Sequence, residues 1–168
     1  MSASPSDAPP LALGQAQAIV RTDAALRIIQ AAVAYAQARQ IAVNISVVDS
    51  AGLPAAFIRM PGAPLHSIDI AHDKAYTAAS FGLATREWPD ALRNHSAAVR
   101  DGLLRRPRFI AFGGGLPIVE QGLRLGGIGV SGGSEEEDEA IARAGLQAAW
   151  LDRPESGEST PHHLEETP

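Results

Sequence analysis

The sequence of 168 residues contains no cysteine. This absence excludes disulfide bonds, thiolate catalysis and metal sites built on cysteine sulfur. Aromatic residues are also scarce, at 5% of the chain, so the core has to consist of alanine, valine, isoleucine and leucine side chains. A core of such small side chains is typical of thin, closely packed layers of secondary structure.

Long apolar runs and an excess of positive charge are missing as well. No stretch approaches the roughly 20 apolar residues of a membrane-spanning helix. Residues 1–10 lack the basic start and the apolar centre of a signal peptide. The net charge of −5 argues against nucleic acid as a partner. We therefore expect a cytoplasmic protein that binds neither membrane nor nucleic acid.

The composition divides the chain into three segments. Residues 1–21 are predicted to be a flexible lead-in, whose first part is rich in serine, proline and alanine. Residues 151–168 are predicted to be a disordered tail, because proline, glutamate, serine, threonine and histidine dominate there. Residues 22–150 remain as one domain, which is long enough to bury a core.

Glycine is concentrated in one stretch, residues 123–133, which holds five of the sixteen glycines. Its pattern predicts a strand, then a turn, then a helix whose first residues Ser134 to Glu137 have the form of a capping box. Glycine weakens a strand unless a ligand or another backbone must come close. A second glycine cluster occupies residues 113–115. We expect the two clusters to be neighbouring strand ends that shape one small site.

Hydrophobic periodicity and turn residues predict the remaining elements. Two hairpins imply antiparallel pairing, so we expect an α+β fold with helices packed on an antiparallel sheet of about five strands. The predicted helices span residues 23–40 (with Thr22 as N-cap), 67–81, 89 to about 99, and 135–150; the predicted strands span residues 41–48, 54–60, 109–112, 116–120 and 123–130.

The run from Gly127 to Gly132 matches the pattern G-x-G-x-x-G. A dinucleotide site needs this motif in the first turn of a βαβ unit, whereas here it lies in a hairpin strand near the end of the chain. Four acidic residues at 135–138 would repel a phosphate at the start of the next helix. The sequence leaves two interpretations of this glycine-rich run open: a closely packed turn, or a turn that contacts a ligand.

Lys74 and Arg59 are candidates for binding an anionic group. Lys74 lies beside a stripe of small residues, Ala71, Ala75 and Ala78, that lets a helix approach a sheet or a partner subunit closely. It could instead form an ion pair with Asp49 or with a neighbour's carboxylate. A desolvated lysine could also have a lowered pKa and form a Schiff base.

Two histidines flank the start of the second long helix. His66 and His72 could ligate a metal or haem iron, but their spacing of six keeps them off a shared helical face; otherwise they are surface or capping residues. Ser131 is a candidate nucleophile without the G-x-S-x-G elbow, or it hydrogen-bonds a ligand or a turn. Asp49 caps the first hairpin turn or serves as a general base.

Several of these motifs occur in the order and spacing of a known family. The chain from about residue 22 to 149 resembles the haem-degrading domain family, which includes HbpS-like and GlcG-like proteins and the C-terminal domain of PduO-type cobalamin adenosyltransferases. The matching residues are Val47, Val48, Asp49 and Gly52; Phe57, Ile58, Arg59 and Met60; Lys74, Ala75, Thr77, Ala78 and Thr85; Gly114, Gly115, Pro117 and Gly122; residues 126–132; and Asp138.

The resemblance implies a layered, profilin-like fold with a five-stranded antiparallel sheet. It also implies a homo-oligomer, often a tetramer to octamer, in which the helix at residues 71–82 would suit a subunit contact. Some members bind haem or a corrinoid, and HbpS-like members are linked to haem breakdown. Carried over to this chain, the family pattern adds candidate ligand contacts at Thr77, Gly114, Gly115, Gly129 and Gly132.

Three functional hypotheses follow. The first is a haem or tetrapyrrole-binding protein, with degradation as a further activity and with His66, His72 or His95 as the iron ligand. The second is a cofactor-free lyase, isomerase or hydratase, in which Lys74, Arg59 and amides near Ser131 hold an anionic substrate and His66 or His72 acts as acid–base. The third is an accessory oligomer without a site, in which Lys74 is paired inside its own subunit.

Overall fold

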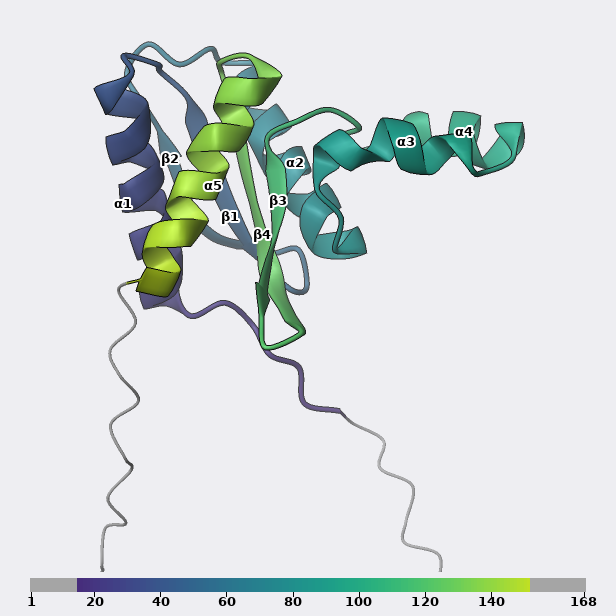
Figure 1. The fold of residues 1–168 in the computed structure, drawn as a ribbon, viewed down its shortest axis with the longest axis horizontal. Coiled ribbons are helices and arrows are strands. Elements are labelled where there is room, and N and C mark those ends of the chain that lie inside the picture. The colour runs from purple at the N-terminus through teal and green to yellow at the C-terminus, as the bar shows by residue number, and fades with distance from the viewer. Residues whose placement is uncertain (1–14, 152–168) are drawn as a thin grey trace, which may run out of the picture.

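The structure, a computed structural model, describes residues 15–151 (Figure 1). Ten elements follow one another along this part of the chain. They are α1 (Thr22–Ala38), β1 (Asn44–Asp49), β2 (Pro54–Arg59), α2 (Ser67–Phe81), the 3-10 helix η1 (Thr85–Glu87), α3 (Trp88–Arg93), α4 (Ala97–Leu104), β3 (Gly115–Glu120), β4 (Leu123–Ser131) and α5 (Glu135–Leu151). None of the helices in residues 15–151 is long and apolar enough to span a membrane.

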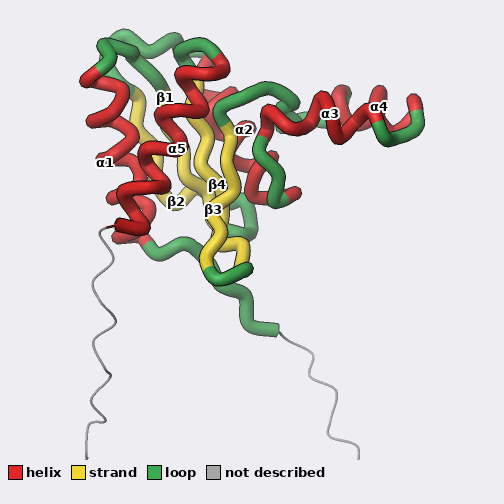
Figure 2. Tube along the Cα trace, in the orientation of Figure 1, coloured by secondary structure: helices red, strands yellow, loops and turns green. Residues whose placement is uncertain are grey.

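The strands form one sheet in the order β2-β1-β4-β3, and every neighbouring pair is antiparallel (Figure 2). The expected mixed α/β class with an antiparallel sheet is confirmed, but the expectation of five strands is wrong, since the described chain has four. Residues 109–112 form a loop. The backbone amide of Ile110 donates to Thr77 Oγ1 at 3.1 Å. This amide therefore bonds a side chain and not a neighbouring strand.

Helices cover both faces of the sheet, with α1 and α5 on one side and α2 on the other (Figure 1). Ile45 and Val47 of β1 join the larger apolar core under α1 and α5. Val48 lies on the opposite side, in a small cluster with Ala75 and Ala79 of α2. This alternation follows from the two-residue period of a strand, and it places the polar residues Asn44 and Ser46 on the same side as Val48, facing α2.

Contact between α2 and β4 depends on glycine. A Cβ added to Gly129 would lie 2.0 Å from the backbone oxygen of Ala71, and one added to Gly127 would lie 2.4 Å from that of Ala75. The strand glycines therefore admit another backbone, which is one of the two reasons expected for them. The small-residue stripe of α2 lies against the protein's own sheet, where Ala71 and Ala75 are fully buried, whereas a subunit contact through this helix stays a prediction.

Some element boundaries differ from expectation. Thr22 is the first residue of α1 and Arg21 is its N-cap. The helix expected at residues 89–99 is two short helices, because Ser96 starts a new one by accepting a bond from the Val99 amide at 3.3 Å. β1 begins at Asn44 rather than at residue 41, since the Ile41 amide still bonds the end of α1 through the Ala36 oxygen at 3.0 Å.

Candidate functional site

Lys74 is the most deeply buried charged side chain near the glycine clusters, with 1% of its surface exposed. Its Nζ donates to Asp138 Oδ2 of α5 and to the Val130 carbonyl of β4, both at 2.8 Å. The same nitrogen lies 5.0 Å from the centre of the Phe112 ring. Lys74 is thus paired inside its own chain, and its partner is Asp138 rather than Asp49.

Burial governs the ionisation of this pair. Desolvation lowers the pKa of Lys74, and the attraction of Asp138 opposes that shift. Desolvation likewise raises the pKa of Asp138, against the pull of Lys74 and of the backbone bond from Gly133. The two ions stabilise each other only as a pair, because an unpartnered charge at this depth would be strongly unfavourable.

Gly114 and Gly115 lie against Lys74, and Gly113 lies against Glu135, so the predicted closeness of this glycine cluster to the end of β4 is confirmed. The Val130 amide donates to the Gly114 oxygen at 2.9 Å, and Gly115 pairs with Gly129 across β3 and β4. A Cβ on Gly114 would lie 2.7 Å from Lys74 Nζ, and its φ of +112° is in the region that favours glycine. We call Lys74, Asp138, Phe112, Gly114 and Gly115 the Lys74 cluster.

The turn after β4 is filled by carboxylates. The Gly133 amide donates to Asp138 Oδ1 at 2.9 Å, and the Ser134 amide donates to Glu137 Oε2 at 2.8 Å. Ser134 Oγ in turn accepts from the Glu137 amide at 3.2 Å, so the predicted capping box is confirmed. Gly132, the first residue of this turn, has a φ of +146°. The backbone amides of Gly133 and Ser134 therefore already have partners within the chain.

Ser131 and Arg59 lie on the α2 side of the sheet but on different strands. Both pair with Asn44 of β1, one from each side, so they are roughly 10 Å apart at the usual strand spacing. Arg59 donates to the Ala63 oxygen at 2.9 Å. Asn44 donates to Pro64, while its Oδ1 has no hydrogen-bond partner in the described part of the chain.

His72 has a different environment from Lys74, although it is only two residues away. Its Nδ1 lies 2.7 Å from Ser46 Oγ, and its ring stacks on Phe57 with centroids 4.8 Å apart. No hydrogen bond to Nε2 is formed within residues 15–151. We call His72, Ser46 and Phe57 the His72 cluster. Two helical residues differ by about 200° in direction, so the two clusters face opposite sides of α2.

The remaining candidates are dispersed. His66 is exposed at the N-cap of α2 and makes no capping bond. Asp49 accepts the amides of Ala51 and Leu53 at 2.9 Å each, which is the capping role expected for it. Thr77 Oγ1 donates to the Arg108 oxygen at 2.9 Å and accepts from the 110 amide, so it holds a loop.

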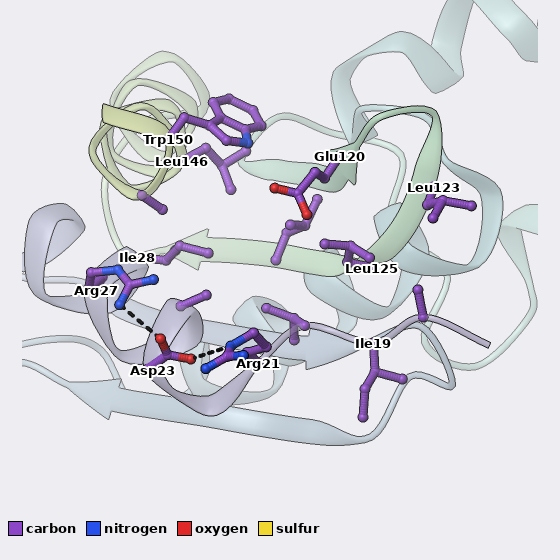
Figure 3. A pocket seen from close by; sticks show the side chains of 15 residues that line it. Ile19, Arg21, Asp23, Arg27, Ile28, Glu120, Leu123, Leu125, Leu146 and Trp150 are labelled. Atoms are coloured by element: carbon purple, nitrogen blue, oxygen red, sulfur yellow. Dashed lines mark hydrogen bonds and ion pairs between the residues drawn. The ribbon is translucent and has the colours of Figure 1, made fainter. Parts of the chain in front are cut away.

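A cavity of about 500 Å³ lies elsewhere, between α1, α5 and the β3–β4 hairpin (Figure 3). Apolar side chains dominate its walls. At one end Asp23 accepts from Arg21 and Arg27, and these bonds lower the pKa of Asp23 to about 2. The hydrophobic pattern of the sequence did not predict this cavity. The apolar wall residues include Ile19, Val20, Ile28, Ile118, Leu123, Leu125, Leu146 and Trp150.

Sequence reasoning missed three contacts of these clusters. Asp138, although part of the family pattern, was not assigned a role, and Phe112 was placed in a strand. For Ser46, the sequence showed only its place in the alternating pattern of β1, which does not predict a contact with His72. In residues 15–151 no group of three or more histidine, aspartate or glutamate side chains is arranged to hold a metal ion.

The fold and the Lys74 cluster define a small layered α/β protein with a family signature. The chain belongs to the family described as haem degrading protein, HbpS-like, whose sequence pattern matches residues 20–147. The corrinoid adenosyltransferase PduO of Citrobacter freundii is 38% identical over 122 residues. Those residues are 73% of this chain but 36% of that protein, so the chain spans about a third of the relative.

Two solved structures resemble the whole domain. The Klebsiella pneumoniae protein ORFY is 31% identical with a TM-score of 0.76, and the match covers 83% of this chain and 97% of that one. A PduOC structure solved as a complex with haem is 34% identical with a TM-score of 0.71, covering 77% and 94%. The predicted family is confirmed by these matches.

Proposed function

We propose that this protein binds haem or a related tetrapyrrole through the His72 cluster. The observation that carries the proposal is the imidazole of His72, which is held at Nδ1 by Ser46 and has no described partner at Nε2. A hydrogen bond to one ring nitrogen orients the other toward a metal and increases its basicity. Similarity to a relative solved with haem supports the same ligand.

The surroundings of His72 fit a tetrapyrrole. Phe57 stacks on the imidazole and is 39% exposed, so an apolar ring face is available beside the proposed iron ligand. Arg59 is two residues further along β2 and shares the face of Phe57. Its guanidinium can pair with a carboxylate side group of the ligand. When bound, haem supplies the iron; the chain supplies the ligand, the apolar contact and the counter-charge.

His66 and His95 are weaker candidates for the iron ligand. Both are exposed, and His95 lies in the break between α3 and α4. Neither ring is held by a hydrogen bond or a stacking partner among residues 15–151. Ordering a free side chain on binding costs conformational entropy. His72, already fixed on two sides, avoids that cost.

A haem titration followed by Soret absorbance tests the proposal on purified protein. Wild type should show a sharp, stoichiometric Soret shift, and His72→Ala should lose it. His66→Ala and His95→Ala are matched controls that should keep it. Weak, non-saturating binding that ignores His72→Ala would refute the proposed site. Haem degradation, the further activity that the family description names, predicts that the Soret band of haem bound to wild type decays when peroxide is added, faster than the band of free haem mixed with His72→Ala.

The reading as an accessory oligomer is the second candidate, and the pairing of Lys74 with Asp138 favours it. It predicts no saturable ligand uptake. The cofactor-free enzyme stays a prediction with less support, because Lys74 is inaccessible and lies on the other side of α2 from His72. A cytoplasmic location and a homo-oligomer of four to eight subunits also stay predictions.

A further inference from the structure

The cavity between α1, α5 and the β3–β4 hairpin takes no part in the proposed function, because the His72 cluster lies on the other face of the sheet (Figure 1). We propose that this cavity is a second ligand site, which binds an apolar carboxylate such as a medium-chain fatty acid. The acyl chain lies between the two helices and the hairpin, and the carboxylate binds Arg27. The two sites share no residue, so the inference does not depend on haem binding.

The size and the walls of the cavity suit a small apolar molecule. Its volume of about 500 Å³ falls within the roughly 300–1,000 Å³ of pockets that hold small ligands. Three large wall residues from three different segments are only partly covered by the fold: Ile19, Leu123 and Trp150 are 55%, 58% and 45% exposed (Figure 3). An acyl chain in the cavity would remove part of this apolar surface from water, which favours binding.

One end of the cavity has a surplus of positive charge. Arg21 and Arg27 share the single carboxylate of Asp23, at 3.0 Å and 3.1 Å (Figure 3). The other carboxylate on the wall, Glu120, comes from β3 and already interacts with another group. Two guanidinium groups against one carboxylate leave one positive charge for a bound anion.

Arg27 also keeps a hydrogen-bond donor without an acceptor. Its Nε–H is buried and has no partner among residues 15–151, although buried donors are almost always paired. The side chain as a whole is 33% exposed, so a ligand can reach it. A carboxylate can accept from two N–H groups of one guanidinium at once. A ligand carboxylate at Arg27 would therefore supply the acceptor that the described chain lacks, which an ammonium group could not do.

Three probes with the same tail and different head groups test the proposal on the full chain: decanoate, decanol and decylammonium. Trp150 reports binding, because it lines the cavity and its emission should shift to shorter wavelength when a ligand shields it from water. The other tryptophan, Trp88, packs against Phe81 and Phe109, and Trp88→Phe should keep the signal. Decanoate should bind saturably and decanol about 10-fold more weakly, and decylammonium should bind most weakly of the three.

Two variants change the head-group contact and the space for the tail separately. Arg27→Met should weaken decanoate binding by about 10-fold or more and leave decanol binding unchanged, since only the carboxylate loses a charged partner. Arg39→Met is the matched control, because the Arg39 guanidinium stacks on the Tyr35 ring at the other end of α1, and it should change neither. Ala149→Phe fills part of the cavity and should abolish binding of both probes. Far-UV circular dichroism checks that each variant is folded, and one variant suffices if the other unfolds.

Saturable binding that prefers the carboxylate and is weakened by Arg27→Met, but not by Arg39→Met, supports the proposal. Absence of binding, equal binding of the three probes, or indifference to Arg27→Met would overturn it. Haem also combines an apolar body with carboxylates, so the titration is repeated on haem-loaded protein. Unchanged decanoate affinity there supports two separate sites, whereas displacement of decanoate by haem would overturn the second site. The titration of haem-free protein stands even if haem does not bind.

Discussion

Two sides of one helix carry the polar chemistry of this protein, and they differ in what remains to be bound. On one side of α2, Lys74 is closed in by Asp138 and the Val130 carbonyl. On the other side, His72 is fixed by Ser46 and Phe57 and keeps one ring nitrogen without a described partner. The fully paired Lys74 therefore has a structural role, whereas His72, which is held in place but keeps one ring nitrogen without a described partner, is the candidate for binding a ligand.

The largest expected effect comes from breaking the Lys74 cluster. Asp138→Ala should lower the free energy of unfolding by about 3–5 kcal/mol, because it leaves an uncompensated buried charge. Urea denaturation measures this. Lys74→Met combined with Asp138→Leu should recover most of the loss, since replacing a buried pair by apolar residues is often neutral or stabilising. Equal destabilisation by the double variant would show that the pair itself, and not the orphaned charge, matters.

Substitution of Gly129 tests the close contact on which the Lys74 side depends. Gly129→Ala would place a Cβ 2.0 Å from the Ala71 oxygen, so the free energy of unfolding should fall by about 3 kcal/mol as backbone has to move. Gly102→Ala in α4 is the matched control, because nothing lies within 4 Å of its added Cβ. That change should stabilise the helix by roughly 0.5–1 kcal/mol. Tolerance of Gly129→Ala in a thermal melt would contradict the close packing.

Removal of the hydrogen bond to His72 tests the other side of α2. Ser46→Ala should weaken haem binding by about 10- to 100-fold, because the imidazole loses its orientation while the iron ligand remains. The Soret titration measures this, with Ser50→Ala as the control. Ser50 lies in the turn of the first hairpin, and its hydroxyl donates to the Ala18 oxygen. Unchanged affinity in Ser46→Ala would show that the hydrogen bond does not position the ring.

The smallest effect concerns an ion pair at the surface. The pKa of Asp23 is lowered from 3.8 to about 2 by Arg21 and Arg27. A depressed carboxyl pKa stabilises the fold above the unfolded value and loses that effect as pH falls, so the contribution should disappear between about pH 4 and 2. Asp23→Asn should flatten this part of the curve of stability against pH only slightly, since exposed pairs contribute little. A large change would mean that Asp23 is less accessible than the structure shows.

Much of the local structure was predictable because short-range chemistry controls it. The capping box at Ser134 and the caps on the Asp49 turn form between residues less than five positions apart. The second hairpin turns at Gln121 and Gly122, whose φ values of 50° and 78° are the left-handed pair that such a turn needs. Two-residue alternation and helical stripes located the two hairpins and the three long helices.

The candidate site was predicted only in part. The sequence indicated that the glycine clusters lie together and that Lys74 is unusual in its place. It did not show that Lys74 would be paired internally, or that Ser46 would hold His72. The catalytic candidates Lys74, His66, His72 and Ser131 were proposed one by one from their places in the sequence, and the structure places Lys74 and His72 on opposite sides of one helix.

The sequence by itself determined the family, the long elements and the antiparallel pairing of the hairpins, because periodicity and turn chemistry act over a few residues. The tertiary structure alone decided that Lys74 meets Asp138, 64 positions away, and that Thr77 takes the amide that a fifth strand would have used. It also decided that α3 and α4 project from the rest of the domain (Figure 1). Such outcomes depend on which surfaces pack together, and hydrophobic burial, which drives that packing, is not directional.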